Sequence, residues 1–136
     1  MKLPDFNNLV REYKKQVVAA IMGTVQIDEA SFSDHNATLT ATKVKLEEYA
    51  SPQLLFSIDV DNTNKCYGFS IQCLCKDEDG AVIDAPDTFI DLGRGSLNGL
   101  QYGTLYLPDE LEQIETIEVS LTRPIYENED NQKGVS

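Results

Sequence analysis

All three cysteines of the chain fall in the stretch NTNKCYGFSIQCLCKDEDGAV, which spans residues 62–82. Aspartates surround them: Asp59 and Asp61 precede the stretch, and Asp77 and Asp79 lie inside it. Thiolates bind zinc and exchange disulfides, whereas carboxylates bind calcium. This stretch is therefore the first place to test for a metal or redox site.

A structural zinc site needs four ligands, and the three cysteines with the single histidine, His35, would just supply them. Residues 67–77 alternate between apolar and polar side chains, which predicts one continuous strand. Cys66 and Cys73 would then lie about 23 Å apart at about 3.3 Å per residue. That distance is too long for two ligands of one ion, so we predict no zinc site.

Cys73 and Cys75 share a predicted strand face with Phe69 and Ile71, in a C-x-C spacing. Redox pairs of the thioredoxin kind use C-x-x-C, and side chains that run parallel on one strand face do not meet disulfide geometry. Buried free cysteine behaves as a small hydrophobic residue, so we expect both in the core. Cys66 stands at the strand edge beside a loop, and we expect its thiol to react with a probe.

Calcium is the alternative for the carboxylates, which supply hard oxygen ligands. The EF-hand pattern fails, because Lys65 replaces a ligand and no glutamate closes the loop. In an antiparallel hairpin the turns at 61–66 and 77–80 would lie at opposite ends, about 30 Å apart. Three aspartates stay as metal candidates, because Asp61 could meet Asp84 or Asp87 as the chain returns. They would make the chain a calcium-dependent module similar to C2 domains; otherwise we expect no metal and no cofactor.

Nucleophilic catalysis would have to use His35, the only histidine, which lies in the turn signal SDHN. We interpret it as a solvated turn residue. The glycine-rich stretch GRGSLNG at 93–99 has no lysine and no helical pattern after it, unlike a phosphate-binding loop. We therefore predict that the chain is not an enzyme.

Residues 1–23 have helical spacing with one apolar face and end at Gly23, which predicts an amphipathic helix. This helix would cover one side of the core, or pack against a partner or a second copy of the chain. Phe6 and Tyr13 are the aromatic residues that we expect at such a contact. The apolar positions are Leu3, Phe6, Leu9, Val10, Tyr13, Val17, Ala20 and Ile21.

After Gly23 the apolar period changes to two. Strong alternation covers residues 53–61, 67–77 and 117–121, which predicts half-buried strands. Weaker candidates are 24–32, 37–46, 81–85, 88–92 and 100–107. The alternation slips within 24–32 and within 37–46, which indicates a bulge or a crossing between sheets. The whole pattern predicts an all-β fold with one helix: an antiparallel immunoglobulin-like β-sandwich of seven or eight strands. The sandwich would span residues 24–123, followed by a polar tail at 124–136.

The turn grammar of the middle of the chain resembles small bacterial immunoglobulin-like domains of the FxLYD type. The matching pieces are Val60–Asn62, Asp77–Gly80 and Gly103–Leu107, so the resemblance covers residues 53–121. IQCLCKD stands where that family has its aromatic-Leu-Tyr-Asp element, and the N-terminal helix is not part of the family pattern. The resemblance implies an accessory or interaction module with no catalytic residues.

Charge limits the classes of partner. The chain has 23 acidic and 11 basic residues, a net charge of -12, which repels nucleic acid and anionic lipid. The sequence shows no secretory leader and no membrane span, and its number of cysteines is odd. We therefore expect a cytoplasmic protein that binds neither nucleic acid nor membrane. By elimination we predict a non-catalytic protein-binding module, an accessory or adaptor subunit, which self-associates through the helix or contacts a partner through Tyr102 and Tyr106. The alternative is an acidic decoy, as in phage-encoded inhibitors, that occupies the site of a nucleic-acid-binding enzyme.

Overall fold

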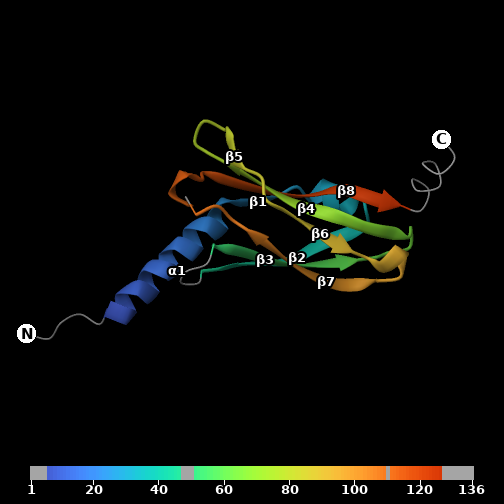
Figure 1. Ribbon diagram of the computed structural model, residues 1–136, viewed down its shortest axis with the longest axis horizontal. Coiled ribbons are helices and arrows are strands. Elements are labelled where there is room, and N and C mark those ends of the chain that lie inside the picture. Colours follow the sequence, from blue (N-terminus) through green and yellow to red (C-terminus); the bar gives the residue numbers. More distant parts are fainter. Residues whose placement is uncertain (1–5, 47–50, 110, 127–136) are drawn as a thin grey trace, which may run out of the picture.

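Two β-sheets stacked face to face form the body of the protein, and one long helix extends from it (Figure 1). A computed structural model describes residues 6–46, 51–109 and 111–126, without the side chains of residues 6–12 and 112. Sheet A has the order β1-β8-β4, with β5 and β6 pairing with successive parts of β4, and sheet B has the order β2-β3-β7. Sheet A consists of β1 (Val25–Ile27), β4 (Cys66–Lys76), β5 (Val82–Asp84), β6 (Asp87–Asp91) and β8 (Thr116–Tyr126); sheet B of β2 (Ala37–Lys45), β3 (Gln53–Val60) and β7 (Gly99–Tyr106). The helices are α1 (Phe6–Thr24), α2 (Glu29–Ser33) and the 3-10 turns η1 (Gly93–Gly95) and η2 (Leu111–Gln113).

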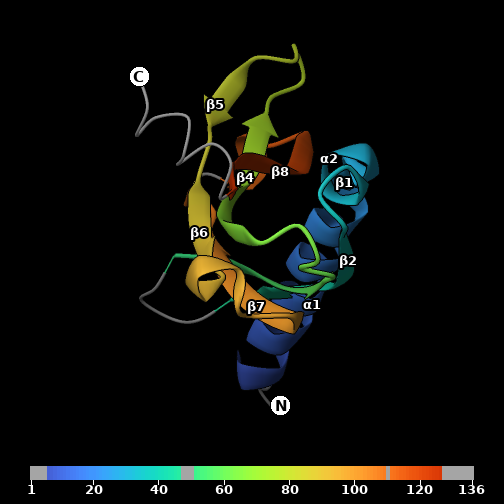
Figure 2. The same ribbon diagram turned by 90° about the vertical axis from the view of Figure 1, so that its right-hand side faces the viewer.

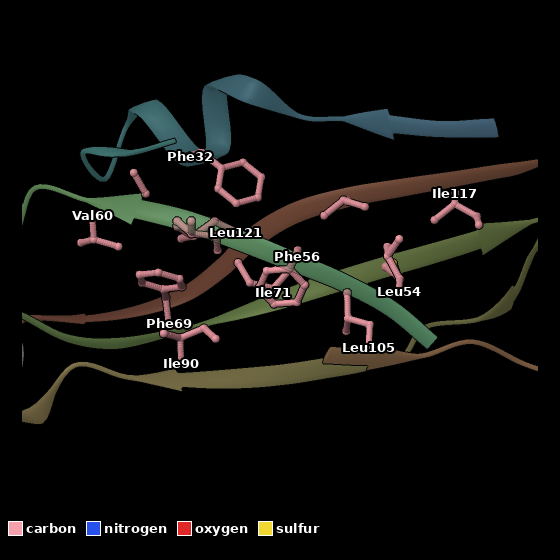
Figure 3. Close-up of a cluster of buried hydrophobic side chains, with 14 of the residues drawn as sticks. Phe32, Leu54, Phe56, Val60, Phe69, Ile71, Ile90, Leu105, Ile117 and Leu121 are labelled. Atoms are coloured by element: carbon pink, nitrogen blue, oxygen red, sulfur yellow. The ribbon is translucent and has the colours of Figure 1, made fainter. Parts of the chain in front are cut away.

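The core fills the space between the two sheets, as the period-two pattern predicts. Alternate residues of β3, β4 and β8 point inward from both sides and interdigitate (Figure 3). The coarse prediction of a sandwich-like all-β fold with a helix is therefore confirmed, including strands in all eight predicted regions of the described chain. The buried side chains include Leu54, Phe56, Ile58 and Val60 of β3, Phe69, Ile71, Cys73 and Cys75 of β4, and Ile117, Val119 and Leu121 of β8.

Helix α1 attaches to the sandwich by its C-terminal half. Ile21 is buried, and Val17, Val18 and Met22 pack against the core. Tyr13, two turns earlier, is 68% exposed, and Figure 1 shows this part of the helix extending beyond the sheets. The helix runs one residue further than predicted, to Thr24. No helix in the described part of the chain is long and apolar enough to cross a membrane.

The region 24–32 differs from the single strand that the sequence predicts. Only Val25–Ile27 form a strand, and it pairs with β8 in parallel, so the sandwich is not wholly antiparallel. Asp28 then ends the strand and caps α2, because its carboxylate accepts the N–H of Ser31. The slip in alternation therefore reflects a change from strand to helix, which buries Phe32 from the turn of α2.

The second slip, within β2, is a true bulge. The register with β3 shifts between Leu39 and Ala41, which leaves Thr40 without a partner across the ladder. The Thr40 hydroxyl lies 2.7 Å from the Ser57 hydroxyl and donates to the Ser57 carbonyl at 3.0 Å. Of the two alternatives that the sequence left for this slip, a bulge or a crossing between sheets, the structure has the bulge.

Strand β8 continues three residues past the predicted end of the sandwich at residue 123. Arg123 has a positive φ of 51°, and the register with β4 is irregular there, so the alternation that would identify a strand is broken. Pairing resumes at Ile125 with Gly68 and at Tyr126 with Cys66. The rest of the predicted tail, residues 127–136, lies outside the described residues.

Candidate binding surface

The two central cysteines are core residues. Cys73 and Cys75 have no exposed surface. Burial, with the adjacent Cys75, raises the pKa of the Cys73 thiol to about 12, and burial, with the nearby Asp84 carboxylate, raises the pKa of Cys75 to about 11. Since the thiolate is the nucleophile and the metal ligand, both side chains are held in their unreactive form at neutral pH.

Cys66 is also buried, which contradicts the exposed position expected from the sequence. It is the first residue of β4 and is 3% exposed, and its thiol donates to the Gly68 carbonyl at 3.3 Å. The preceding loop folds back over it, because the Asn62 side chain bonds to both the N–H and the C=O of Cys66. All three thiols are therefore inside the protein.

The three aspartates kept as metal candidates are spread along the molecule. Asp61 follows β3, next to the turn that starts β4 at Cys66. Asp87 pairs with Gln72 and Asp84 with Cys75, about 20 and 30 Å further along β4 at about 3.3 Å per residue. Their separation follows from the strand pairing, and no cluster of three metal-ligating side chains occurs in the described part of the chain.

His35 has a structural partner. Its Nδ1 lies 2.5 Å from the Tyr126 hydroxyl, and the two rings are 5.7 Å apart. The contact joins the turn after α2 to the last residue of β8. His35 is partly buried rather than solvated, and the contact with Tyr126 accounts for its position.

Three large exposed side chains lie on one strand, β7. Tyr102 is 73% exposed, Tyr106 60% and Leu100 49%, and all three alternate along β7 on the outer face of sheet B. Their neighbours across β3 are Ser57, Gln53 and Asp59. Leu55 of β3 lies between them on the same face. We call this the tyrosine face, and it consists of Leu55, Leu100, Tyr102 and Tyr106.

Lysines border the tyrosine face on its far side. Lys43 pairs with Leu55 and Lys45 with Gln53, so both lie on the outer side of β2. The face thus combines aromatic and apolar groups with a polar border, as at many protein contacts.

The start of β7 is anchored by hydrogen bonds of Asn62. Asn62 donates its amide to the Leu97 carbonyl at 3.0 Å, and its backbone N–H donates to the Asn98 side chain at 2.9 Å. These bonds tie the turn before β4 to the connection after η1. They fix the point at which β7 begins, and hence which of its residues point outward.

The two predicted contact regions are separate. Tyr13 is exposed on α1, and α1 contacts β2, the opposite edge of sheet B from β7. The side chain of Phe6 lies outside the described residues. The sequence analysis singled out Tyr102 and Tyr106 but missed Leu55 and Leu100. Alternation within β3 and within β7 does not show that the four residues of the tyrosine face lie together. That also requires the pairing of the two strands, which the sequence does not give.

Comparison of the chain with protein-family models, with curated proteins and with solved structures finds no match.

Proposed function

We propose that the protein is a non-catalytic protein-binding module, a cytoplasmic accessory or adaptor subunit, and that it contacts its partner through the tyrosine face. The observation that carries the proposal is the exposure of Tyr102 and Tyr106 on one regular strand. Exposed tyrosines on regular structure are pre-ordered, so that little conformational entropy is lost when they are buried. Aromatic side chains are also the residue types in which binding energy concentrates.

The strand order supports an immunoglobulin-like relationship of the kind that the FxLYD resemblance implies. Sheet B has the order β2-β3-β7, which corresponds to strands A, B and E of an immunoglobulin domain. In sheet A, β4 lies beside β8 as strand C lies beside strand F. The short parallel strand β1 occupies the edge at which such a domain has its last strand. Domains with this architecture commonly serve as interaction modules.

Photo-crosslinking from defined positions tests the proposal. A photoreactive phenylalanine analogue placed at Tyr102 or Tyr106 should link the protein to one partner in cells of the native host. The matched control is the same analogue at Phe89, which is 52% exposed on β6 in sheet A. An equal yield of the same adduct from Phe89, or no adduct from the two tyrosine positions, would contradict the assignment of the face.

The acidic decoy is the second candidate, because carboxylates gather at one end of the sandwich. Asp77, Glu78, Asp79 and Glu115 line one hollow of about 330 Å³. A basic nucleic-acid-binding protein held there would dissociate as salt is raised. Asp77 also bonds the N–H groups of its own turn, so the test variant is Glu78→Gln with Asp79→Asn. Loss of a salt-sensitive partner from this variant would favour the decoy over the tyrosine face.

A further inference from the structure

Strand β7 is an edge of sheet B whose outer side pairs with no strand in the described part of the chain. It is eight residues long and has the sequence GLQYGTLY, with no charged residue and no proline. Strand β6 contacts β7 at the same side of the sandwich, but it belongs to the other sheet and pairs with β4 (Figure 2). Natural proteins guard such edges with charges, prolines, bulges, short strands or a cover.

The other sheet edges do have these guards. β1 is only three residues long. The edge formed by β5 and β6 is interrupted at Pro86 and carries acidic residues in both strands. β2 has a bulge at Thr40, carries Lys43 and Lys45, and contacts both α1 and α2. β7 is therefore the one edge among the described strands that is long, regular and uncharged.

The hydrogen-bonding groups of β7 that point outward follow from the register. The Leu107 N–H donates to the Pro52 carbonyl at 2.8 Å, which marks that pair as a bonded one. In an antiparallel ladder bonded pairs recur at every second residue, so Gly103 and Leu105 bond to β3. The N–H and C=O groups turned to the open edge are those of Leu100, Tyr102, Thr104 and Tyr106.

We infer that β7 pairs antiparallel with β7 of a second copy of this chain, which joins the two B sheets into one sheet of six strands. With the two-fold axis beside Gly103, all four outward residues of each strand meet, and about eight backbone hydrogen bonds form. Leu100 then lies opposite Tyr106 of the second copy, and Tyr102 opposite its Thr104. Apolar and aromatic groups therefore face one another in a full-length, self-complementary register.

Charge opposes a second copy least at this edge, because β7 has no charged residue. Each chain carries a net charge of -12, so two copies repel wherever their acidic surfaces meet. The paired β7 strands themselves place no carboxylates opposite one another. The pairing also places two tyrosine faces side by side on one continuous sheet. This inference concerns the purified chain alone, and so it holds or fails independently of the partner proposed above.

Sedimentation equilibrium of the full chain from about 5 to about 500 µM tests the pairing, because an edge contact is smaller than a standard interface. We expect a monomer–dimer equilibrium that tightens as salt rises from about 0.05 to about 0.5 M, since salt screens the repulsion and β7 has no ion pair to lose. A chain that stays monomeric over this range would overturn the inference. So would a dimer that dissociates with salt, which would point to the basic residues of α1.

Hydrogen exchange identifies the edge without any substitution. The amides of Leu100, Tyr102, Thr104 and Tyr106 should exchange at least about tenfold more slowly at the high concentration than at the low one. Those of Gly103 and Leu105 are already bonded to β3 and should change little. A dimer without this alternation would refute pairing at β7. Protection that appears only when another protein is added would assign the edge to that partner instead of a second copy.

A matched pair of lysine substitutions completes the test. Thr104→Lys gives β7 the kind of charged guard that β2 has, and should weaken the dimer at least about tenfold. Ala41→Lys adds the same charge to the same outer face, but on β2, and should leave the dimer within about threefold of wild type. Equal effects of the two substitutions would refute the role of the edge.

Discussion

Gly103 is the residue at which β7 meets the core. Replacing a glycine by alanine in a strand usually stabilises a protein, but at Gly103 the added methyl group should destabilise it. Its inner side is covered by the ring of Phe56, with which it pairs across β3. A Cβ atom at Gly103 would lie 2.3 Å from Cζ and 2.8 Å from Cε2 of that ring. Phe56 is 4% exposed and surrounded by core side chains, so the ring has little room to yield (Figure 3).

The size of the effect follows from two opposing terms. Replacing glycine by alanine in a strand of ordinary conformation stabilises a protein by about 0.4–1 kcal/mol through the unfolded chain. Overpacking a filled core costs about 1–3 kcal/mol. Gly103→Ala should therefore lower the free energy of unfolding by about 1–2 kcal/mol, equivalent to a fall in Tm of roughly 4–8 °C. Urea unfolding followed by circular dichroism measures it in a chain that has no tryptophan.

Gly23→Ala is the matched control, because a Cβ atom there meets nothing within 4 Å. In helix α1 the same change should stabilise by about 0.5–1 kcal/mol. Phe56→Leu removes the atom closest to the added methyl, so the cost of Gly103→Ala should shrink in that background. If Gly103→Ala stabilises the protein as Gly23→Ala does, the pairing of β3 with β7 described above is wrong.

Two further predictions concern side chains that the site depends on. Asn62→Ala removes the side-chain bonds to Cys66 and Leu97, and should lower the free energy of unfolding, measured in urea, by about 2–3 kcal/mol. The control is Thr63→Ala, at an exposed neighbour, which should stay within about 0.5 kcal/mol of wild type. The raised pKa values of Cys73 and Cys75 make folding favour the protonated thiols, so stability is complete below pH 9 and falls as pH rises from 9.0 toward 11 and 12. Tm should drop less between about pH 8 and about pH 10 in Cys73→Val/Cys75→Val than in wild type, and equal slopes would contradict the burial of the thiols.

The period-two pattern was sufficient to predict the sandwich because its strands are amphipathic. Alternate residues of the core strands are buried, and the slip at Thr40 marks a real bulge. The same periodicity predicted that Cys73 and Cys75 are core residues and not a reactive pair. These features are local, since they depend on which residues alternate within one segment.

Features that depend on strand pairing or on contacts across turns could not be predicted from the sequence. The parallel pairing of β1 with β8 joins segments about ninety residues apart, and nothing in VQI indicates it. Cys66 is buried and its backbone bonds to the Asn62 side chain, a contact across a turn that alternation does not encode. The tyrosine face needs the order β2-β3-β7, because only that order brings Leu55 beside Leu100 and leaves β7 at the edge.

The affinity of the crosslinked partner for wild type and two variants tests the proposed function most directly. Tyr102→Ser with Tyr106→Ser should weaken binding at least about tenfold, because truncation removes the two aromatic contacts. Phe89→Ser, on sheet A, should bind within about twofold of wild type, with circular dichroism confirming that all variants are folded. Unchanged affinity in the double tyrosine variant, or an equal loss in Phe89→Ser, would contradict binding through the tyrosine face.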